Sequence, residues 1–149
     1  MRVLLDVNVI VDILGATEDV LYSVQALDVM LLRGLEPCMV VSEAATVQYA
    51  LAARKYASDE RAMEAIEGIS QLLTVLDATE ADLRNALRNP LGDFEDALLA
   101  WAAHRHGVDL IVTRNLRDFR TSPVAAMSPQ QFCDAYRPEG YDYDLIELG

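Results

Sequence analysis

The residues with the clearest chemical potential are the acids in NPLGDFEDALLAWAAHRHG, which spans residues 89–107. The dipole and the free N–H groups of a helix N-terminus favour acids in the first turn, which accounts for Asp93 and Glu95. Asp96 leads straight into an apolar run, and Asp6 ends another such run near the N-terminus. An unpaired carboxylate is costly next to a core. We therefore predict a functional role for Asp6 and Asp96.

Short apolar runs alternate along the chain with segments of helical periodicity. The strands are predicted at residues 3–5, 39–41, 74–76, 110–112 and 125–127. The helices are predicted at residues 7–14, 20–32, 42–57, 59–73, 79–88 and 93–105 and from residue 128 onward. Apolar strands without strong alternation are typical of a parallel sheet that is covered on both faces. The sequence therefore predicts an α/β fold with a central parallel sheet of four to five strands.

Ligands of open parallel sheets bind beyond the carboxyl ends of the strands. Asp6 ends the first predicted strand, and Asp118 follows the fourth. A right-handed crossover brings the start of the 93–105 helix to the same edge, and the spacing of Asp93 and Asp96 places both on one helical face. Four acids can therefore converge there: Asp6, Asp93, Asp96 and Asp118.

Converging carboxylates repel one another, and a divalent cation removes that repulsion. Oxygen ligands without a nearby histidine suit Mg²⁺ or Mn²⁺ rather than Zn²⁺. His104 and His106 lie at the far end of their predicted helix, so we do not expect them to be ligands. A metal in such a site activates water and stabilises charge on phosphoryl oxygens. The acids therefore predict hydrolysis of a phosphate ester.

The chain has 149 residues, of which 52% are apolar, so one globular domain is expected. No apolar run approaches the roughly 20 residues that span a membrane, and acids at Asp6 and Asp12 argue against a signal peptide. Cys38 and Cys133 lack metal-type spacing, and we interpret them as reduced core thiols of a cytoplasmic protein. The net charge of −12 counts against a simple electrostatic nucleic-acid binder, but not against an enzyme that recruits cations.

Four stretches of the chain resemble PIN-domain proteins, the fold of the ribonuclease toxins of bacterial type II toxin–antitoxin pairs. These stretches are VLLDVNVIVDIL, DFEDALLAWAA, LIVTRNLRDF and MSPQQF. The resemblance covers residues 1–136 as one domain and leaves an acidic tail at 137–149. It implies a three-layer α/β/α fold, an Mg²⁺- or Mn²⁺-dependent ribonuclease with an RNA substrate, and an antitoxin partner.

The resemblance also implies roles for individual residues. Asp6 and Asp96 would hold the metal, with Asp118 as a further ligand or acting through water. Asp93 would orient or activate the attacking water. The expected supporting residues are Asn8, which shapes the turn after the first strand, Thr113, which contacts metal-bound water, and Asn115. Arg114 and Arg117 lie beside the acids in the sequence, and either of them could hold the RNA backbone.

Two positions depart from the family pattern. Many members carry a glutamate a few residues inside the helix after the second strand, where this chain has Val47 or Gln48. Glu43 lies a full turn earlier and is a possible additional acid. Asn115 stands where an aspartate is usual. These departures motivate an alternative function, in which a PIN fold with a weakened metal site acts as a protein-interaction module for a basic segment.

Other phosphate-transfer folds also place an aspartate after the first strand. Phosphatases of the haloacid-dehalogenase type need a second aspartate where this chain has Asn8, and response-regulator receivers need a lysine near the last strand, whereas the only lysine is Lys55. No glycine-rich turn follows the first strand, which counts against dinucleotide binding. The apolar helices predicted at 20–32 and 42–57 indicate a homodimer.

Overall fold

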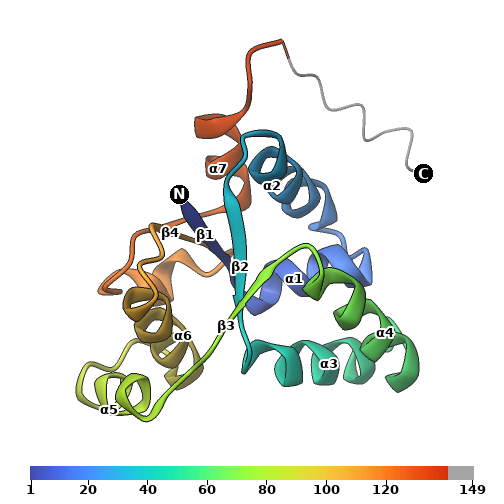
Figure 1. The fold of residues 1–149 in the computed structure, drawn as a ribbon. Helices are drawn as coiled ribbons and strands as arrows, with labels where there is room; N and C mark the ends of the chain where they lie inside the picture. Colours follow the sequence, from blue (N-terminus) through green and yellow to red (C-terminus); the bar gives the residue numbers. More distant parts are fainter. Residues whose placement is uncertain (141–149) are drawn as a thin grey trace.

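The computed structural model describes residues 1–140, and its centre is a sheet of five parallel strands in the order β3-β2-β1-β4-β5 (Figure 1). The strands are β1 (Arg2–Leu5), β2 (Glu36–Val40), β3 (Thr74–Leu76), β4 (Leu110–Val112) and β5 (Ala126–Met127). Each pair of neighbours is parallel. The predicted α/β fold with a parallel sheet is confirmed, at the upper limit of its expected strand number.

Seven α-helices and one 3₁₀ helix accompany the strands within the described residues, and the last of them, α7, follows β5. They are α1 (Val7–Gly15), α2 (Val20–Leu32), α3 (Glu43–Ala53), α4 (Asp59–Ser70), α5 (Glu80–Arg88), α6 (Phe94–Arg105), η1 (Leu116–Phe119) and α7 (Pro129–Tyr136). The helix predicted at 42–57 ends earlier than expected, at Ala53. Lys55 has a φ of 61°, in the left-handed region that no α-helix continues through.

Helices cover both faces of the sheet. Figure 1 shows α5 and α6 on one side and α1–α4 with α7 on the other. Successive residues of a strand point to opposite faces, so Val3 and Leu5 pack into one apolar cluster with Phe132, whereas Leu4 packs into the other with Leu99. Burying an aliphatic side chain of this size stabilises the fold by about 1.5–3 kcal/mol. The two clusters therefore fix the sheet between its helical layers.

The strand order creates a crevice at the carboxyl edge of the sheet. The chain runs from β1 through β2 to β3 on one side, and then continues on the other side of β1 with β4 and β5. Connections leaving β1 and β4 thus diverge in opposite directions, which is the topological switch point where α/β folds bind ligands. The helices α1, α3 and α6 begin at this edge, so their first turns can supply side chains to it.

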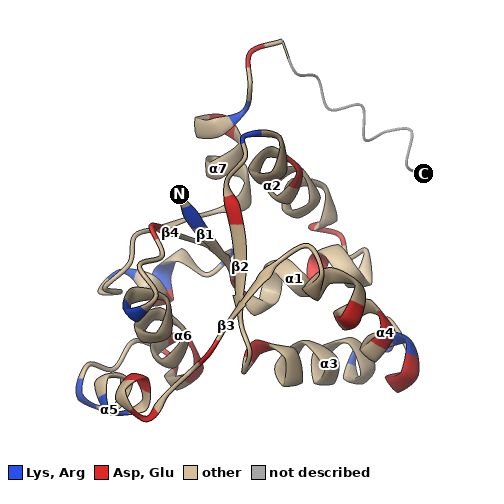
Figure 2. Cartoon of the chain, viewed as in Figure 1, with Lys and Arg blue, Asp and Glu red and all other residues tan. Residues whose placement is uncertain are grey.

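Charge is distributed unevenly over the layers. Figure 2 shows basic residues gathered around α5, α6 and the loop after β4, while acidic residues occur on both sides of the sheet. Cys38 and Cys133 are free and buried, as predicted, and burial raises the pKa of each thiol to about 11. No helix in the described part of the chain is long and apolar enough to cross a membrane. Most of the predicted acidic tail, residues 141–149, lies outside the described residues.

Candidate functional site

Asp6 occupies the centre of the carboxyl edge, directly after β1, and only 2% of its surface is exposed. Its carboxylate accepts a hydrogen bond from the N–H of Val7 at 2.7 Å and one from the hydroxyl of Thr113 at 2.7 Å. Asp6 therefore begins α1 as its N-cap, and Asn8 lies inside the helix rather than in the expected turn. Burial raises the pKa of Asp6, although these two hydrogen bonds oppose the rise.

Thr113 links Asp6 to the loop after β4. It is fully buried, its hydroxyl donates to Asp6, and its Oγ1 accepts the N–H of Asn115 at 3.0 Å. The hydroxyl proton of Thr113 is therefore used in the hydrogen bond to Asp6. Thr113 positions both this carboxylate and the segment that carries Asn115 and Asp118.

Glu43 approaches the same point from the first turn of α3 and is 2% exposed. Its Oε1 accepts the N–H of Val40 at 2.8 Å, whereas its Oε2 is buried without a hydrogen-bond partner among the described residues. Burial, and next the charge of Asp6, raise the pKa of Glu43 well above its usual range. A buried carboxylate oxygen with no partner is costly, and it needs a donor or a cation that the side chains do not provide.

Val47 and Gln48, which stand where many family members carry a glutamate, are engaged elsewhere in this chain. Val47 is in the core, and Gln48 donates a hydrogen bond to Asp59 on α4 at 3.0 Å. Because α3 begins only two residues after β2 ends, its first turn faces the sheet edge and its second turn has already moved away. Glu43 is therefore the α3 acid that lies within electrostatic reach of Asp6.

The start of α6 supplies three more acids. Asp93 is the N-cap and accepts the N–H of Glu95 at 2.7 Å. Asp96 is half-buried one turn later, and burial followed by the charges of Asp6, Asp93 and Asp118 raises its pKa to about 7. The charges that raise the pKa of Asp96 come from acids on three different elements. The fold therefore brings these acids together, as the sequence predicts.

A cavity of about 230 Å³ lies at this edge of the sheet. It is lined by Asp6, Val7, Asn8, Thr46, Asp93, Glu95, Asp96, Asn115 and Asp118. Glu95 and Thr46 were not predicted. The helix dipole alone accounts for Glu95 in the sequence, but three acids within four residues are a signal that more than one of them faces the site.

Gly92 leaves room for Asp118 beside this cavity. A Cβ atom at position 92 would lie 2.7 Å from Oδ1 of Asp118, closer than two such atoms approach. The absence of a side chain at Gly92 therefore allows the Asp118 carboxylate to turn toward α6.

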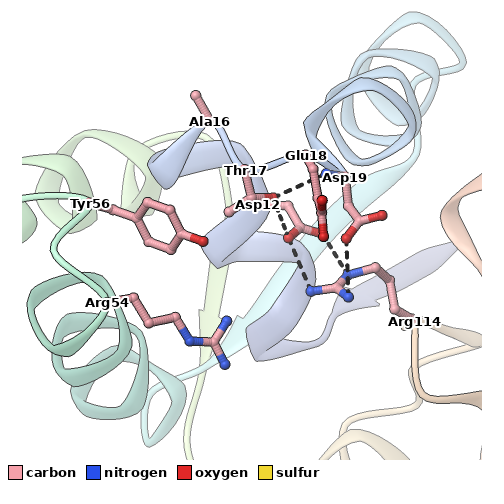
Figure 3. Close-up of a pocket in the computed structure, with 8 residues that line it drawn as sticks. All are labelled: Asp12, Ala16, Thr17, Glu18, Asp19, Arg54, Tyr56 and Arg114. Carbon is pink, nitrogen blue, oxygen red and sulfur yellow. Dashed lines mark hydrogen bonds and ion pairs between the residues drawn. The ribbon is translucent and has the colours of Figure 1, made fainter.

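The two arginines expected to hold RNA do not line the acidic cavity. Arg114 donates two hydrogen bonds to buried Asp12, at 2.8 and 3.1 Å, and pairs with Asp19 at 3.3 Å (Figure 3). Its charge is thus already compensated by two carboxylates. Arg117 lies exposed on η1 and is not among the lining residues.

The donor set of the cavity fits a hard divalent cation. All the candidate ligands are oxygens. Asp6 and Asp96, which repel each other, line the cavity, whereas Glu43, with its unpartnered Oε2, is not a lining residue but is buried within electrostatic range of Asp6. As the side chains stand, no three His, Cys, Asp or Glu groups within residues 1–140 lie close enough together to hold one metal ion. Ligation would therefore require the carboxylates to draw together around the ion.

Comparisons with known proteins agree with this architecture. A sequence profile of the PIN domain matches residues 2–117. Among solved structures, VapBC2 from Rickettsia felis bound to a promoter DNA fragment is similar with 19% identity and a TM-score of 0.65, over 86% of this chain and 98% of the other. FitAcB from Neisseria gonorrhoeae matches with 23% identity and a TM-score of 0.65, over 86% and 98% of the two chains.

A toxin–antitoxin complex from Klebsiella pneumoniae matches with 20% identity and a TM-score of 0.60, over 85% of this chain and 97% of the other. No curated protein matches the sequence. The structural matches establish the fold, and the profile match covers most of the chain, including Asp6, Glu43 and Asp96. The chain belongs to the PIN-domain family.

Proposed function

We propose that this protein is an Mg²⁺- or Mn²⁺-dependent endoribonuclease, the toxin component of a type II toxin–antitoxin module. The observation that carries the proposal is the acidic cavity at the switch point, where burial and neighbouring acids raise the pKa of Asp96 to about 7. It is supported by the nearby buried Glu43, whose pKa is also raised and whose Oε2 has no partner among the described residues. Burying several acids around one cavity destabilises the fold unless a ligand uses them. RNA is the substrate class that the family implies.

The side chains have distinct roles in this proposal. Asp6, Glu43 and Asp96 hold the metal, and Asp118 holds it directly or through water. When bound, the metal lowers the pKa of a water molecule and offsets charge on the phosphodiester oxygens. Asp93, the most exposed of the proposed catalytic acids, orients the attacking water and accepts its proton. Thr113 keeps Asp6 aimed into the cavity.

The amide side chains of Asn8 and Asn115 line the cavity between the acids. An amide N–H donates a hydrogen bond to a phosphate oxygen without adding negative charge. In our proposal these residues hold the substrate phosphate. The replacement of the usual aspartate by Asn115 then favours anion binding over an additional metal ligand.

The proposed partner is an antitoxin protein with a basic segment. Structures similar to this chain include toxin–antitoxin complexes, and the net charge of −12 favours a basic partner. We also propose a homodimer through α2 and α3, because Leu31, Leu32 and Tyr49 are 45%, 52% and 72% exposed on these helices. Light scattering of the pure protein measures the proposed dimer directly.

The test of the ribonuclease proposal compares the wild-type protein with Asp96→Asn on a labelled mixed-sequence single-stranded RNA, with and without Mn²⁺. We expect metal-dependent cleavage by the wild type and a loss of at least about a hundredfold in the variant, with an unchanged circular dichroism spectrum. Cleavage at the wild-type rate by clean Asp96→Asn protein contradicts the assignment.

One observation favours a second candidate function, a protein-interaction module. The carboxylates are not grouped closely enough to share a metal as they stand, and an acidic cavity also suits an arginine or lysine of a partner protein. Tight binding of a basic partner together with no RNA cleavage and no stabilisation by Mn²⁺ would favour this module over the enzyme.

A further inference from the structure

A second and larger pocket lies beside the acidic cavity, on the flank of α1 (Figure 3). Its volume is about 460 Å³, which is within the range of about 300–1,000 Å³ typical of small-ligand pockets. It is lined by Asp12, Ala16, Thr17, Glu18, Asp19, Arg54, Tyr56 and Arg114. We call it the α1 pocket.

One wall of the α1 pocket is formed by side chains that bond to one another. Asp12 is fully buried and accepts hydrogen bonds from the hydroxyls of Thr17 and Ser23, at 2.7 and 3.0 Å, and two from Arg114. Asp19 pairs with Arg114 at 3.3 Å. These groups satisfy one another and form one wall of the pocket.

Two charged side chains of the pocket have no partner of their own, and they lie on different sides: Arg54 faces Arg114 across the pocket, and Glu18 lies beside Asp19 (Figure 3). The guanidinium of Arg54 and the carboxylate of Glu18 line the pocket, and neither side chain makes a hydrogen bond or an ion pair with any residue of the described range, 1–140. Figure 3 shows Arg54 and Tyr56 entering from the end of α3, with Glu18 across the pocket at the start of α2. A cationic donor and an anionic acceptor thus face one space without pairing with each other.

Tyr56 supplies a fixed aromatic surface to this space. Its side chain is 44% exposed, and its ring packs so closely on the end of α1 that a Cβ at Gly15 would lie 3.2 Å from the ring. Single-stranded RNA is commonly recognised by stacking its bases on exposed aromatic rings. The ring of Tyr56 has the position and exposure for such a contact.

The α1 pocket adjoins the acidic cavity. Asn8 lines the cavity and Asp12 the pocket, and the two residues are one turn of α1 apart, on the order of 6 Å along its axis. Arg114 of the pocket is followed directly by Asn115 of the cavity. A nucleotide next to the cleaved phosphodiester can therefore reach the pocket.

We propose that the α1 pocket binds an unpaired guanine of the RNA substrate and sets the cleavage preference of the enzyme, an inference that rests on the proposed ribonuclease function. Guanine offers acceptors at O6 and N7 for the guanidinium of Arg54, and donors at N1 and N2 for the carboxylate of Glu18. Adenine presents an amino donor where Arg54 needs an acceptor. The pocket is also net acidic, which favours a base over a phosphate group.

The experiment compares two fluorescein-labelled RNAs, UUUGUUU and UUUAUUU, in cleavage assays with Mn²⁺. We expect the wild-type protein to cleave the guanine RNA with a kcat/KM about tenfold higher or more. Glu18→Gln and Arg54→Ala should reduce this ratio to about one. The matched controls Glu60→Gln and Lys55→Gln remove the same charges outside the pocket and should keep the ratio.

The outcomes separate this inference from the proposed function. Cleavage of both RNAs at equal rates, or a preference that both pocket variants retain, overturns the guanine site and leaves the ribonuclease intact. If no RNA is cleaved, the ribonuclease proposal fails. The affinities of the same two RNAs, measured by fluorescence anisotropy, then test whether the pocket binds guanine. Preferential binding of the guanine RNA that is lost in Glu18→Gln then supports the site, and equal or absent binding overturns it.

Discussion

At the scale of single residues, two fully buried acids show how burial alone fails to identify a functional carboxylate. Asp12 is as buried as any residue of the chain, but four hydrogen bonds from Arg114, Thr17 and Ser23 satisfy it. Glu43 has one hydrogen bond and one orphaned oxygen. The first arrangement is satisfied without a ligand, whereas the second would be completed by a cation. We therefore propose a structural role for Asp12 and a metal-binding role for Glu43.

Glu43→Gln should abolish the stabilisation of the protein by Mn²⁺. The amide keeps the size of the side chain but removes the charge that, in our account, holds the metal. A metal that binds only the folded state stabilises it by about 2.7 kcal/mol at a hundredfold excess over its Kd. Thermal denaturation with and without Mn²⁺ measures this effect, with Glu60→Gln as an exposed control. An equal rise in Tm for Glu43→Gln and the wild type would argue against Glu43 as a ligand.

Gly92→Ala should weaken Mn²⁺-dependent cleavage several-fold with little loss of stability. The added methyl group meets Oδ1 of Asp118 at 2.7 Å, so this carboxylate must rotate out of the cavity. Such a rotation is inexpensive because the atom is the end of a flexible side chain. The concentration of Mn²⁺ that gives half-maximal cleavage should rise.

The matched control is Gly68→Ala, since a Cβ at position 68 meets nothing within 4 Å. This change in the last turns of α4 should leave cleavage unchanged and stabilise the helix by up to about 1 kcal/mol. If Gly92→Ala and Gly68→Ala show the same Mn²⁺ dependence as the wild type, the placement of Asp118 at the metal is wrong.

At the scale of elements, α6 is the helix on which the site depends most. Ala97, Ala100 and Ala103 are fully buried, so α6 lies close against the sheet, and its N-terminal turn brings Asp96 to the cavity. Its C-terminal end is fastened to α5 by Arg105, which donates to Asp82 at 3.0 and 3.1 Å. The orientation of the acids at one end of α6 is therefore supported by an ion pair at the other end.

Asp82→Asn should destabilise the protein by about 1–3 kcal/mol at neutral pH, an amount reduced for the partial exposure of Arg105. Burial by itself would raise the pKa of Asp82, but the hydrogen bonds from Arg105 and from the N–H of Thr79 outweigh it and lower the pKa. The carboxylate therefore contributes stability above its unfolded pKa, and that contribution is lost as the pH falls through the lowered folded pKa.

Urea denaturation at pH 7 and at pH 3 checks both parts of this prediction. The deficit of Asp82→Asn relative to the wild type should shrink at the lower pH. Glu80→Gln on the same helix, whose ion pair with Arg84 is exposed, should change stability by less than about 0.5 kcal/mol. A deficit for Asp82→Asn that is independent of pH would show that the charge of Asp82 is not responsible.

The extent to which the sequence predicts the positions of strands and site residues also differs between elements. The strands follow from short apolar runs, and the sites of Asp6 and Asp96 follow from their places at the ends of such runs. The place of Glu43 near Asp6 depends on the two-residue connection between β2 and α3, which periodicity does not resolve. The ion pair of Arg114 with Asp12 joins residues that are 102 positions apart in the sequence, so only the tertiary structure shows that the charge of Arg114 is already compensated.

At the scale of the whole molecule, the net charge of −12 limits how RNA is held. The charge counts against non-specific attraction of a polyanion, so in our proposal substrate binding depends on the metal, on a few arginines such as Arg54, and on base contacts in the α1 pocket. The same charge would favour capture by the basic segment of the proposed antitoxin. In this proposal the negative charge of the protein therefore contributes both to the choice of substrate and to the choice of partner.

The affinity for RNA should depend only weakly on salt. One or two phosphate contacts release few counterions, so the logarithm of affinity should fall against the logarithm of monovalent salt concentration with a slope between about −0.7 and −1.4. Anisotropy titrations of a labelled single-stranded RNA at constant Mn²⁺ measure this slope. A slope steeper than about −4 would reveal an extended basic surface that this account lacks.

The most direct test of the central claim is to titrate Mn²⁺ into metal-free protein while following the cleavage of a labelled single-stranded RNA. We predict no cleavage without the metal, a rate that saturates with Mn²⁺, and no rate above background for Asp6→Asn at any Mn²⁺ concentration. Cleavage that persists in EDTA, or folded, partner-free protein that never cleaves in saturating Mn²⁺, would contradict the account of the acidic cavity as the active site of a metal-dependent ribonuclease.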